Sequence, residues 1–252
     1  MLKTLRRLLS RGSEPGGLSL LEAWAQERGH AFRRVRDAQG CAIDGRLGTQ
    51  AWRIEWGASQ RSYVEGFELR LITELNLPKE LQVLVLNRAL MEATERAVYE
   101  HYVDDVQTRI DTETPPEMRW LVMYQKLSAH DLGRLRERYG VVASLLPWAQ
   151  QWLSSSLNDA LAATVDPVPP EQPLTLTISR GRLTLRTAMA DPDLPSLTMW
   201  MSVFEHGLRE ARRVAEEWRD VAGSGQTTQP SLWEHIGPTD PDEPTLRLPK
   251  KG

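Results

Sequence analysis

The chain has 252 residues, 40% of them hydrophobic and 26% charged, a composition that is ordinary for a globular protein with a sizeable core. A formal net charge of -3 argues against a dedicated nucleic-acid-binding protein, because such domains are usually basic. The single cysteine excludes an intrachain disulfide and a CxxC metal site. The sequence contains no run of 18 apolar residues, so we expect no membrane-spanning helix. We therefore expect a cytoplasmic protein.

Residues 1–17 form a basic amphipathic segment followed by a Gly/Pro loop. Leucines and positive charges alternate too closely for a signal peptide, which needs an uninterrupted apolar stretch. One interpretation is a short helix lying on an anionic membrane surface or a partner, with contacts from Leu2, Leu5, Arg6 and Leu9. The alternative is a frayed basic terminus with no role, because so short a helix is marginal in water.

The stretch 41–56 predicts a β-hairpin. With a two-residue turn at Gly48 and Thr49, Ile43 faces Ile54 and the flat indole of Trp52 lies across Gly45. One face of this hairpin is almost wholly apolar, so it should pack on a core.

The stretch 174–187 predicts a second hairpin by the same reasoning. A turn at Arg180 and Gly181 pairs Ile178 with Leu183 and other apolar side chains with one another. We expect further strands at 31–37, 63–72, 82–86 and, after one helical turn, 120–124.

Helices are predicted from caps and from the 3.6-residue period of apolar side chains. Ser19 with Glu22 predicts a helix over 20–28, and Asn87 should cap a helix that runs to about residue 102. Ser128 with Asp131 predicts a helix whose stripe is Leu132, Leu135, Tyr139 and Val142, and Pro147 begins the next one. The most regular pattern predicts a long amphipathic helix over 195–219.

These elements predict the α+β class, with antiparallel hairpins packed against helices in a globular domain over 18–220. Helix then hairpin occurs twice, so the domain divides alternatively into two αββ halves, 18–126 and 127–220. The polar composition of 221–252 predicts a disordered tail.

No pattern of residues assigns a catalytic site, a cofactor or a metal. His101 with Asp104 and Asp105 has suitable ligand types, but HExxH and EF-hand spacings are absent and a solvated helix end is the plainer interpretation. Cys41 lies in a predicted strand, where a buried thiol is usually inert.

Two further groups of residues have competing interpretations. The basic run at 28–36 should be split across both faces of a strand, with Arg33 on one and Arg34 on the other, which weakens a phosphate-binding groove. Seven of the tryptophans fall on apolar faces, which indicates core packing rather than a stacking platform.

In the tail, Leu232, Trp233 and Ile236 stand out from their polar neighbours. They are expected either to dock on a partner or on the protein's own surface, or to be incidental. Together these features favour a non-enzymatic cytoplasmic interaction or adaptor protein, peripheral to the membrane if residues 1–12 bind lipid. The alternative is an enzyme or small-molecule-binding domain with a site between the two halves.

Overall fold

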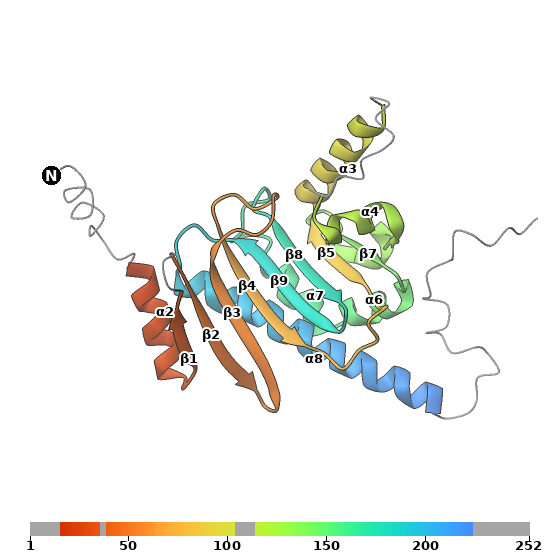
Figure 1. Ribbon diagram of the computed structural model, residues 1–252. Helices are drawn as coiled ribbons and strands as arrows, with labels where there is room; N and C mark the ends of the chain where they lie inside the picture. The colour runs from red at the N-terminus through yellow and green to blue at the C-terminus, as the bar shows by residue number, and fades with distance from the viewer. Residues whose placement is uncertain (1–15, 36–38, 104–113, 224–252) are drawn as a thin grey trace, which may run out of the picture.

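The computed structural model describes residues 16–35, 39–103 and 114–223, and it confirms the predicted α+β class (Figure 1). Nine strands of this part of the chain form one sheet in the order β1-β2-β3-β4-β9-β8-β5-β7-β6, and all neighbours are antiparallel. The strands are β1 (Ala31–Arg34), β2 (Gly40–Leu47), β3 (Gln50–Ala58), β4 (Phe67–Glu74), β5 (Val83–Asn87), β6 (Gln125–Lys126), β7 (Tyr139–Ala143), β8 (Leu174–Ser179) and β9 (Arg182–Ala188).

The helices cover the two faces of the sheet unequally. The described helices are α2 (Gly16–Glu27), α3 (Arg88–Val103), α4 (Trp120–Met123), α5 (Ala129–Leu132), α6 (Leu146–Leu153), α7 (Ser156–Ala162) and α8 (Leu194–Gly223), with 3-10 turns η1 (Pro116–Arg119) and η2 (Gly133–Leu135). Figure 1 places α6, α7 and α8 behind the sheet, and α3 and α4 at the end formed by β5 and β7. Within the described residues, no helix combines the length and the apolar character needed to cross a membrane.

Both predicted hairpins are confirmed, with the predicted registers. Gly48 has φ +60° at the first position of the β2–β3 turn, which only glycine adopts readily, and Ile43 pairs with Ile54. The β8–β9 turn has positive φ at both Arg180 and Gly181, and Ile178 pairs with Leu183. The two hairpins belong to the same sheet, joined through β4.

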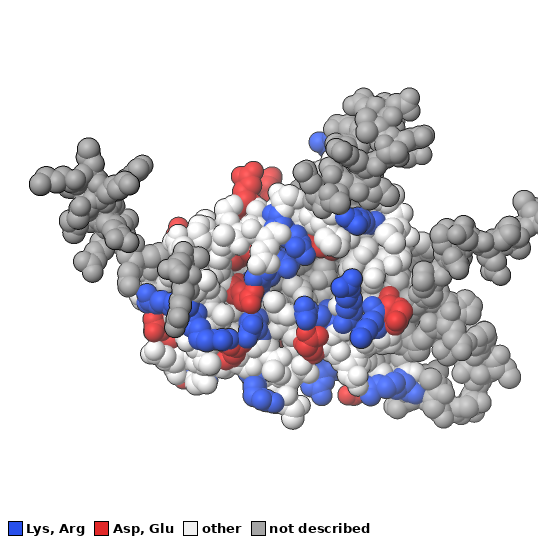
Figure 2. All heavy atoms as spheres, viewed as in Figure 1, with Lys and Arg blue, Asp and Glu red and all other residues white. Residues whose placement is uncertain are grey.

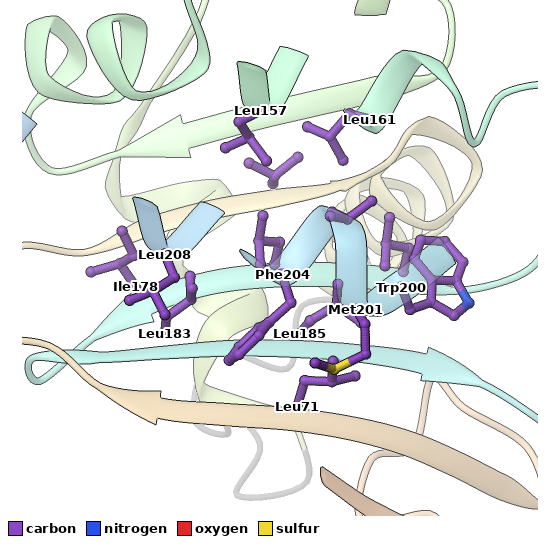
Figure 3. Packing of buried hydrophobic residues seen from close by; sticks show 14 of the residues in the cluster. Leu71, Leu157, Leu161, Ile178, Leu183, Leu185, Trp200, Met201, Phe204 and Leu208 are labelled. Carbon is purple, nitrogen blue, oxygen red and sulfur yellow. The ribbon is translucent and has the colours of Figure 1, made fainter. Parts of the chain in front are cut away.

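The main core lies between the sheet and α8. This helix of 30 residues is about 45 Å long. Its apolar stripe faces inward side chains of β4, β8 and β9, and α7 lies beside α8 on the same side of the sheet (Figure 3). The side chains that meet there include Leu71, Leu157, Leu161, Ile178, Leu183, Leu185, Trp200, Met201, Phe204 and Leu208.

A second, smaller core lies on the other face of the sheet, where η1, α3 and α4 cover β5 and β7. It contains Leu84, Leu86, Met91, Met118 and Trp120. Because β5 is buried on both faces, its residues form the uninterrupted apolar run seen in the sequence.

Most predicted tryptophans are core residues, as expected. Trp24, Trp52, Trp56, Trp148, Trp152 and Trp200 are buried, and Trp218 is partly buried. Trp56 donates its indole N–H to the carbonyl of Met189 at 2.8 Å, and Trp152 donates to the carbonyl of Gly207 at the same distance. The indole nitrogens of these two side chains are satisfied inside the core, whereas those of Trp148 and Trp200 have no hydrogen-bond partner among the described residues.

The helix predicted from Ser128 was wrong in part. Ser128 does cap a helix by accepting from the amide of Asp131 at 3.1 Å, but α5 ends at Gly133, whose φ is +52°. Tyr139 and Val142 belong instead to strand β7, where they pair with β5. A β-branched run buried on both sides satisfies a helical stripe and a strand equally in sequence.

Three other boundaries also differ from prediction. Helix α2 begins at Gly16, so Ser19 and Glu22 lie inside it rather than in a capping box. Asn87 does not cap α3: its amide donates to the carbonyl of Pro170 and its oxygen accepts from the amide of Leu174. The strand predicted at 120–124 is wrong for residues 120–123, which form helix α4; the backbone is extended from Tyr124, and strand β6 covers residues 125 and 126.

Candidate functional site

One face of the sheet is largely free of helices. Side chains alternate along each strand, so apolar residues of β2, β3, β4 and β9 point to α8 and the intervening polar residues point away from it. We call the side of β1–β4 and β9 that faces away from α8 the outer face. Figure 2 shows it with Lys and Arg interleaved with Asp and Glu.

A continuous series of ion pairs crosses the outer face from β1 to β9, and we call it the ion-pair chain. Arg33 contacts Asp44 at 2.5 Å, and Asp44 contacts Arg53 at 2.6 Å. The series continues from Arg53 to Glu55 at 3.8 Å, from Glu55 to Arg70, from Arg70 to Glu68 at 3.4 Å and from Glu68 to Arg186 at 2.8 Å. Five neighbouring strands thus contribute to one charged row.

The ion-pair chain runs from an exposed end to a buried end. The side chain of Arg33 is 61% exposed and that of Arg53 45%, whereas Arg70 is 13%, Arg186 12% and Glu68 2% exposed. At the exposed end, hydrogen bonding from Arg53 holds the pKa of Asp44 below its ordinary value. Screening by water makes each exposed pair worth little, about 0.2 to 1 kcal/mol, while the charged groups of the buried end are desolvated.

The buried end has polar atoms that the described residues do not satisfy. Burial lowers the pKa of Arg186; the neighbouring charges of Arg61 and Arg70 act in the same direction, and Glu68 opposes them. In the described part of the chain, Glu68 Oε2 and Arg70 Nε have no hydrogen-bond partner. The guanidinium groups of Arg61, Arg70 and Arg186 therefore lie near one another at the buried end of the ion-pair chain.

A second buried carboxylate borders this end of the row. Arg61 Nε donates to Glu117 Oε1 at 2.5 Å, and Tyr63 donates its hydroxyl to the same oxygen at 2.8 Å. Burial opposes ionisation of Glu117, but these hydrogen bonds outweigh it and the pKa of this carboxyl lies below its ordinary value. Burial, together with the Glu117 charge, raises the pKa of Tyr63.

Arginines outnumber carboxylates on and around this face. The carboxylates are those of Asp44, Glu55, Glu68, Glu74 and Glu117, and the arginines are Arg33, Arg46, Arg53, Arg61, Arg70, Arg182 and Arg186. The complete chain carries a net charge of -3, so positive charge is concentrated here relative to the rest of the molecule. Planar guanidinium groups fixed in this way match carboxylate and phosphate groups, which they bind with two parallel hydrogen bonds.

Sequence reasoning found part of this face. The predicted splitting of the basic run is confirmed: Arg33 pairs with Asp44 on the outer face, and Arg34 pairs with Glu22 of α2 at 3.0 Å on the other side. His30 packs between Trp24 and Trp52, and Arg36 at the end of the basic run lies outside the described residues. The described arginines Arg33 and Arg34 of the basic run therefore lie on opposite faces of β1.

The buried end was missed because its members are distant in sequence. Glu68 and Arg186 are separated by 118 positions and meet only because β4 pairs with β9. Alternation placed Glu68 and Arg70 on a polar side, but no local signal shows which strand lies beside β4.

The sequence-predicted contact residues lie outside the described residues. This applies to Leu2, Leu5, Arg6 and Leu9 and to Leu232, Trp233 and Ile236, which stay predictions. The side chain of His101 also lies outside the described part of the structure, as do Asp104 and Asp105. Among the residues that the structure describes, no three His, Cys, Asp or Glu side chains gather to hold a metal ion.

Cys41 is buried, as predicted. Its side chain faces the core from β2, and burial raises the pKa of its thiol to about 11. The thiol is therefore protonated at neutral pH, and only the thiolate is an effective nucleophile.

The alternative of a small-molecule site between the two halves can be compared with a groove in the structure. A groove of about 260 Å³ lies between α8 and residues 75–77, with Gln50 at one side. Its volume falls just below the roughly 300 Å³ at which ligand pockets of enzymes and receptors usually begin. The groove is lined by residues of both halves, but it does not border the ion-pair chain.

Comparisons with known proteins assign no family. No family model matches the chain, and no curated protein matches it. The chain is similar to the crystal structure of the mycobacterial trehalose monomycolate transport factor A, TtfA, with a TM-score of 0.41 and 8% sequence identity over 77% of this chain and 90% of that chain. Likeness of that extent carries no function from one chain to the other.

Proposed function

We propose that this chain is a non-enzymatic interaction protein that binds an acidic segment of a protein partner on the outer face of its sheet. The observation that carries the proposal is the ion-pair chain, in which guanidinium groups from neighbouring strands are held in fixed positions by buried or half-buried carboxylates. A surface whose charged groups are already oriented loses little side-chain entropy when a partner binds.

The chemistry of the face suits an acidic partner better than a basic one. Arginines exceed carboxylates there, and the side chains of Arg33 and Arg53 at the exposed end are 61% and 45% exposed, so N–H donors that do not contact Asp44 or Glu55 stay accessible to a partner. Carboxylates of a partner can add further charge-assisted hydrogen bonds to these guanidinium groups without displacing Asp44.

A labelled hexaglutamate peptide tests the charge requirement, with hexaglutamine as the matched neutral probe and fluorescence anisotropy as the readout. Hexaglutamate should bind, its affinity should fall as salt rises, and hexaglutamine should not bind. Arg53→Glu should weaken binding about fivefold, since about 1 kcal/mol corresponds to that ratio.

Arg209→Glu is the matched control variant. Arg209 is exposed on α8, on the other side of the molecule from the ion-pair chain, and the substitution changes net charge by the same amount. Equal weakening by both variants would mean that the peptide senses overall charge only, and the proposed surface would be wrong.

We further infer a cytoplasmic location with peripheral attachment to an anionic membrane. The support is the basic amphipathic pattern that includes Leu2, Leu5, Arg6 and Leu9, in which each basic residue near a charged surface adds about 1 kcal/mol. This attachment is separate from partner binding, and a flotation assay described below tests it by itself.

A further inference from the structure

The groove between α8 and residues 75–77 is lined by apolar and polar side chains, and its two arginines outnumber the single acid, Glu216. Leu75, Leu77, Ala211 and Ala215 supply apolar atoms, and Arg212 and Arg219 project from α8 beside them. The amide of Leu75 donates to the carbonyl of Gly181 at 2.5 Å, so the loop that forms one wall is tied to the β8–β9 turn. The groove is therefore fixed by the fold.

The chain that continues from α8 begins next to this groove. Arg219 lies four residues before Gly223, about 6 Å along the helix, and Ala211 lies about 18 Å from the same end. Trp233 follows Gly223 by ten residues, which span up to about 33 Å. Trp233 can thus reach any part of the groove.

The composition of that continuation complements the groove. Between residues 224 and 244 the large apolar side chains are Leu232, Trp233 and Ile236, in a run of otherwise small or polar residues. The same stretch has no Lys or Arg and contains the acids Glu234, Asp240, Asp242 and Glu243. An apolar anchor with acidic neighbours complements a groove that offers apolar side chains and an excess of arginine over the single Glu216.

We propose that residues 232–236 dock in the groove of their own chain, with Trp233 against Leu75, Leu77 and Ala215 and the acidic residues facing Arg212 and Arg219. A short connection makes docking intramolecular, at an effective concentration in the millimolar range, so a contact that would be weak between separate molecules is sufficient. The indole then leaves water, which explains its place in a polar stretch.

A nitroxide label on the complete chain tests the proposal by paramagnetic broadening of NMR signals. Ser231→Cys supplies the labelling site, because the native Cys41 is buried and should not react. The amides of Leu75, Leu77 and Ala215 should lose most of their intensity, whereas those of Arg53 and Arg70 on the outer face should keep theirs. A second label at Thr239→Cys guards against disturbance by a probe so close to Trp233.

Substitutions decide whether the broadening reports this contact. Trp233→Ala and Arg212→Glu should each restore the intensities, and Arg209→Glu, the same change on an exposed position of α8 outside the groove, should leave them reduced. An unchanged melting temperature in these variants would show that the fold is intact. The proposal is overturned if the groove shows no broadening, if the outer face is broadened instead, or if the broadening persists in Trp233→Ala. Broadening that grows with protein concentration would also overturn it, because that result would indicate docking on a second copy.

Discussion

Replacing Gly45 with alanine should destabilise the protein, because the space that a side chain would need is filled by an indole. Gly45 pairs with Trp52 across β2 and β3, and an added Cβ would lie 2.7 Å from Trp52 Cε2 and still closer to two other indole carbons. The indole is 5% exposed and makes a T-shaped contact with the His30 ring at 4.7 Å between centroids, so neighbouring side chains enclose it.

The expected loss comes from overpacking. Extra methyl groups in a well-packed core typically cost about 1 to 3 kcal/mol, and in a domain of this size each kcal/mol corresponds to about 2 to 4 °C in melting temperature. Alanine also lowers the entropy of the unfolded chain relative to glycine, which offsets roughly 0.4 to 1 kcal/mol.

Gly57→Ala is the matched control for that entropy term. Gly57 lies in β3 of the same sheet, its φ is not positive, and an added Cβ would make ordinary contacts of 3.6 and 3.8 Å. Urea unfolding followed by circular dichroism should show a clear loss of unfolding free energy for Gly45→Ala and little change for Gly57→Ala. Equal effects in the two variants would refute the packing of Trp52 across Gly45.

Three further predictions follow from the site and from the sequence. The pKa of Glu117 is lowered in the folded protein, so the stability that its carboxylate contributes is complete above the ordinary pKa of 4.5 and is lost as pH falls below that value. Between about pH 6 and pH 3 the wild type should therefore lose more unfolding free energy in urea titrations than Glu117→Gln. Similar losses in both proteins would contradict the hydrogen bonds from Arg61 and Tyr63. Cys41 should not react with a thiol reagent at about pH 8 until urea unfolds the chain, and rapid reaction of the folded protein would mean that β2 is open. Full-length protein should float with anionic vesicles, less so as salt rises, and the chain lacking residues 1–12 should not; equal recovery would remove the membrane proposal.

The sequence by itself determined the elements whose partners are close along the chain. In both hairpins the turn residues and the facing apolar side chains are within sixteen positions of one another, so local pairing alone identifies the register. The long helix α8 was recognised because its apolar period is sustained over many turns, and Ser128 was recognised as a cap because a cap depends on the next three residues.

Where a stretch of sequence fits two kinds of local structure equally well, only the tertiary structure decided which of them forms. Tyr139 and Val142 follow a helical period, yet they lie in β7 because β5 offers them a strand partner on one side and two cores bury both faces. Asn87 is a good cap in isolation, but its side chain joins the loop at Pro170 to the start of β8. The candidate site also could not be found from local sequence, since Glu68 and Arg186 become neighbours only through the pairing of β4 with β9. Such long-range pairing depends on the packing of the complete core rather than on any short stretch of residues.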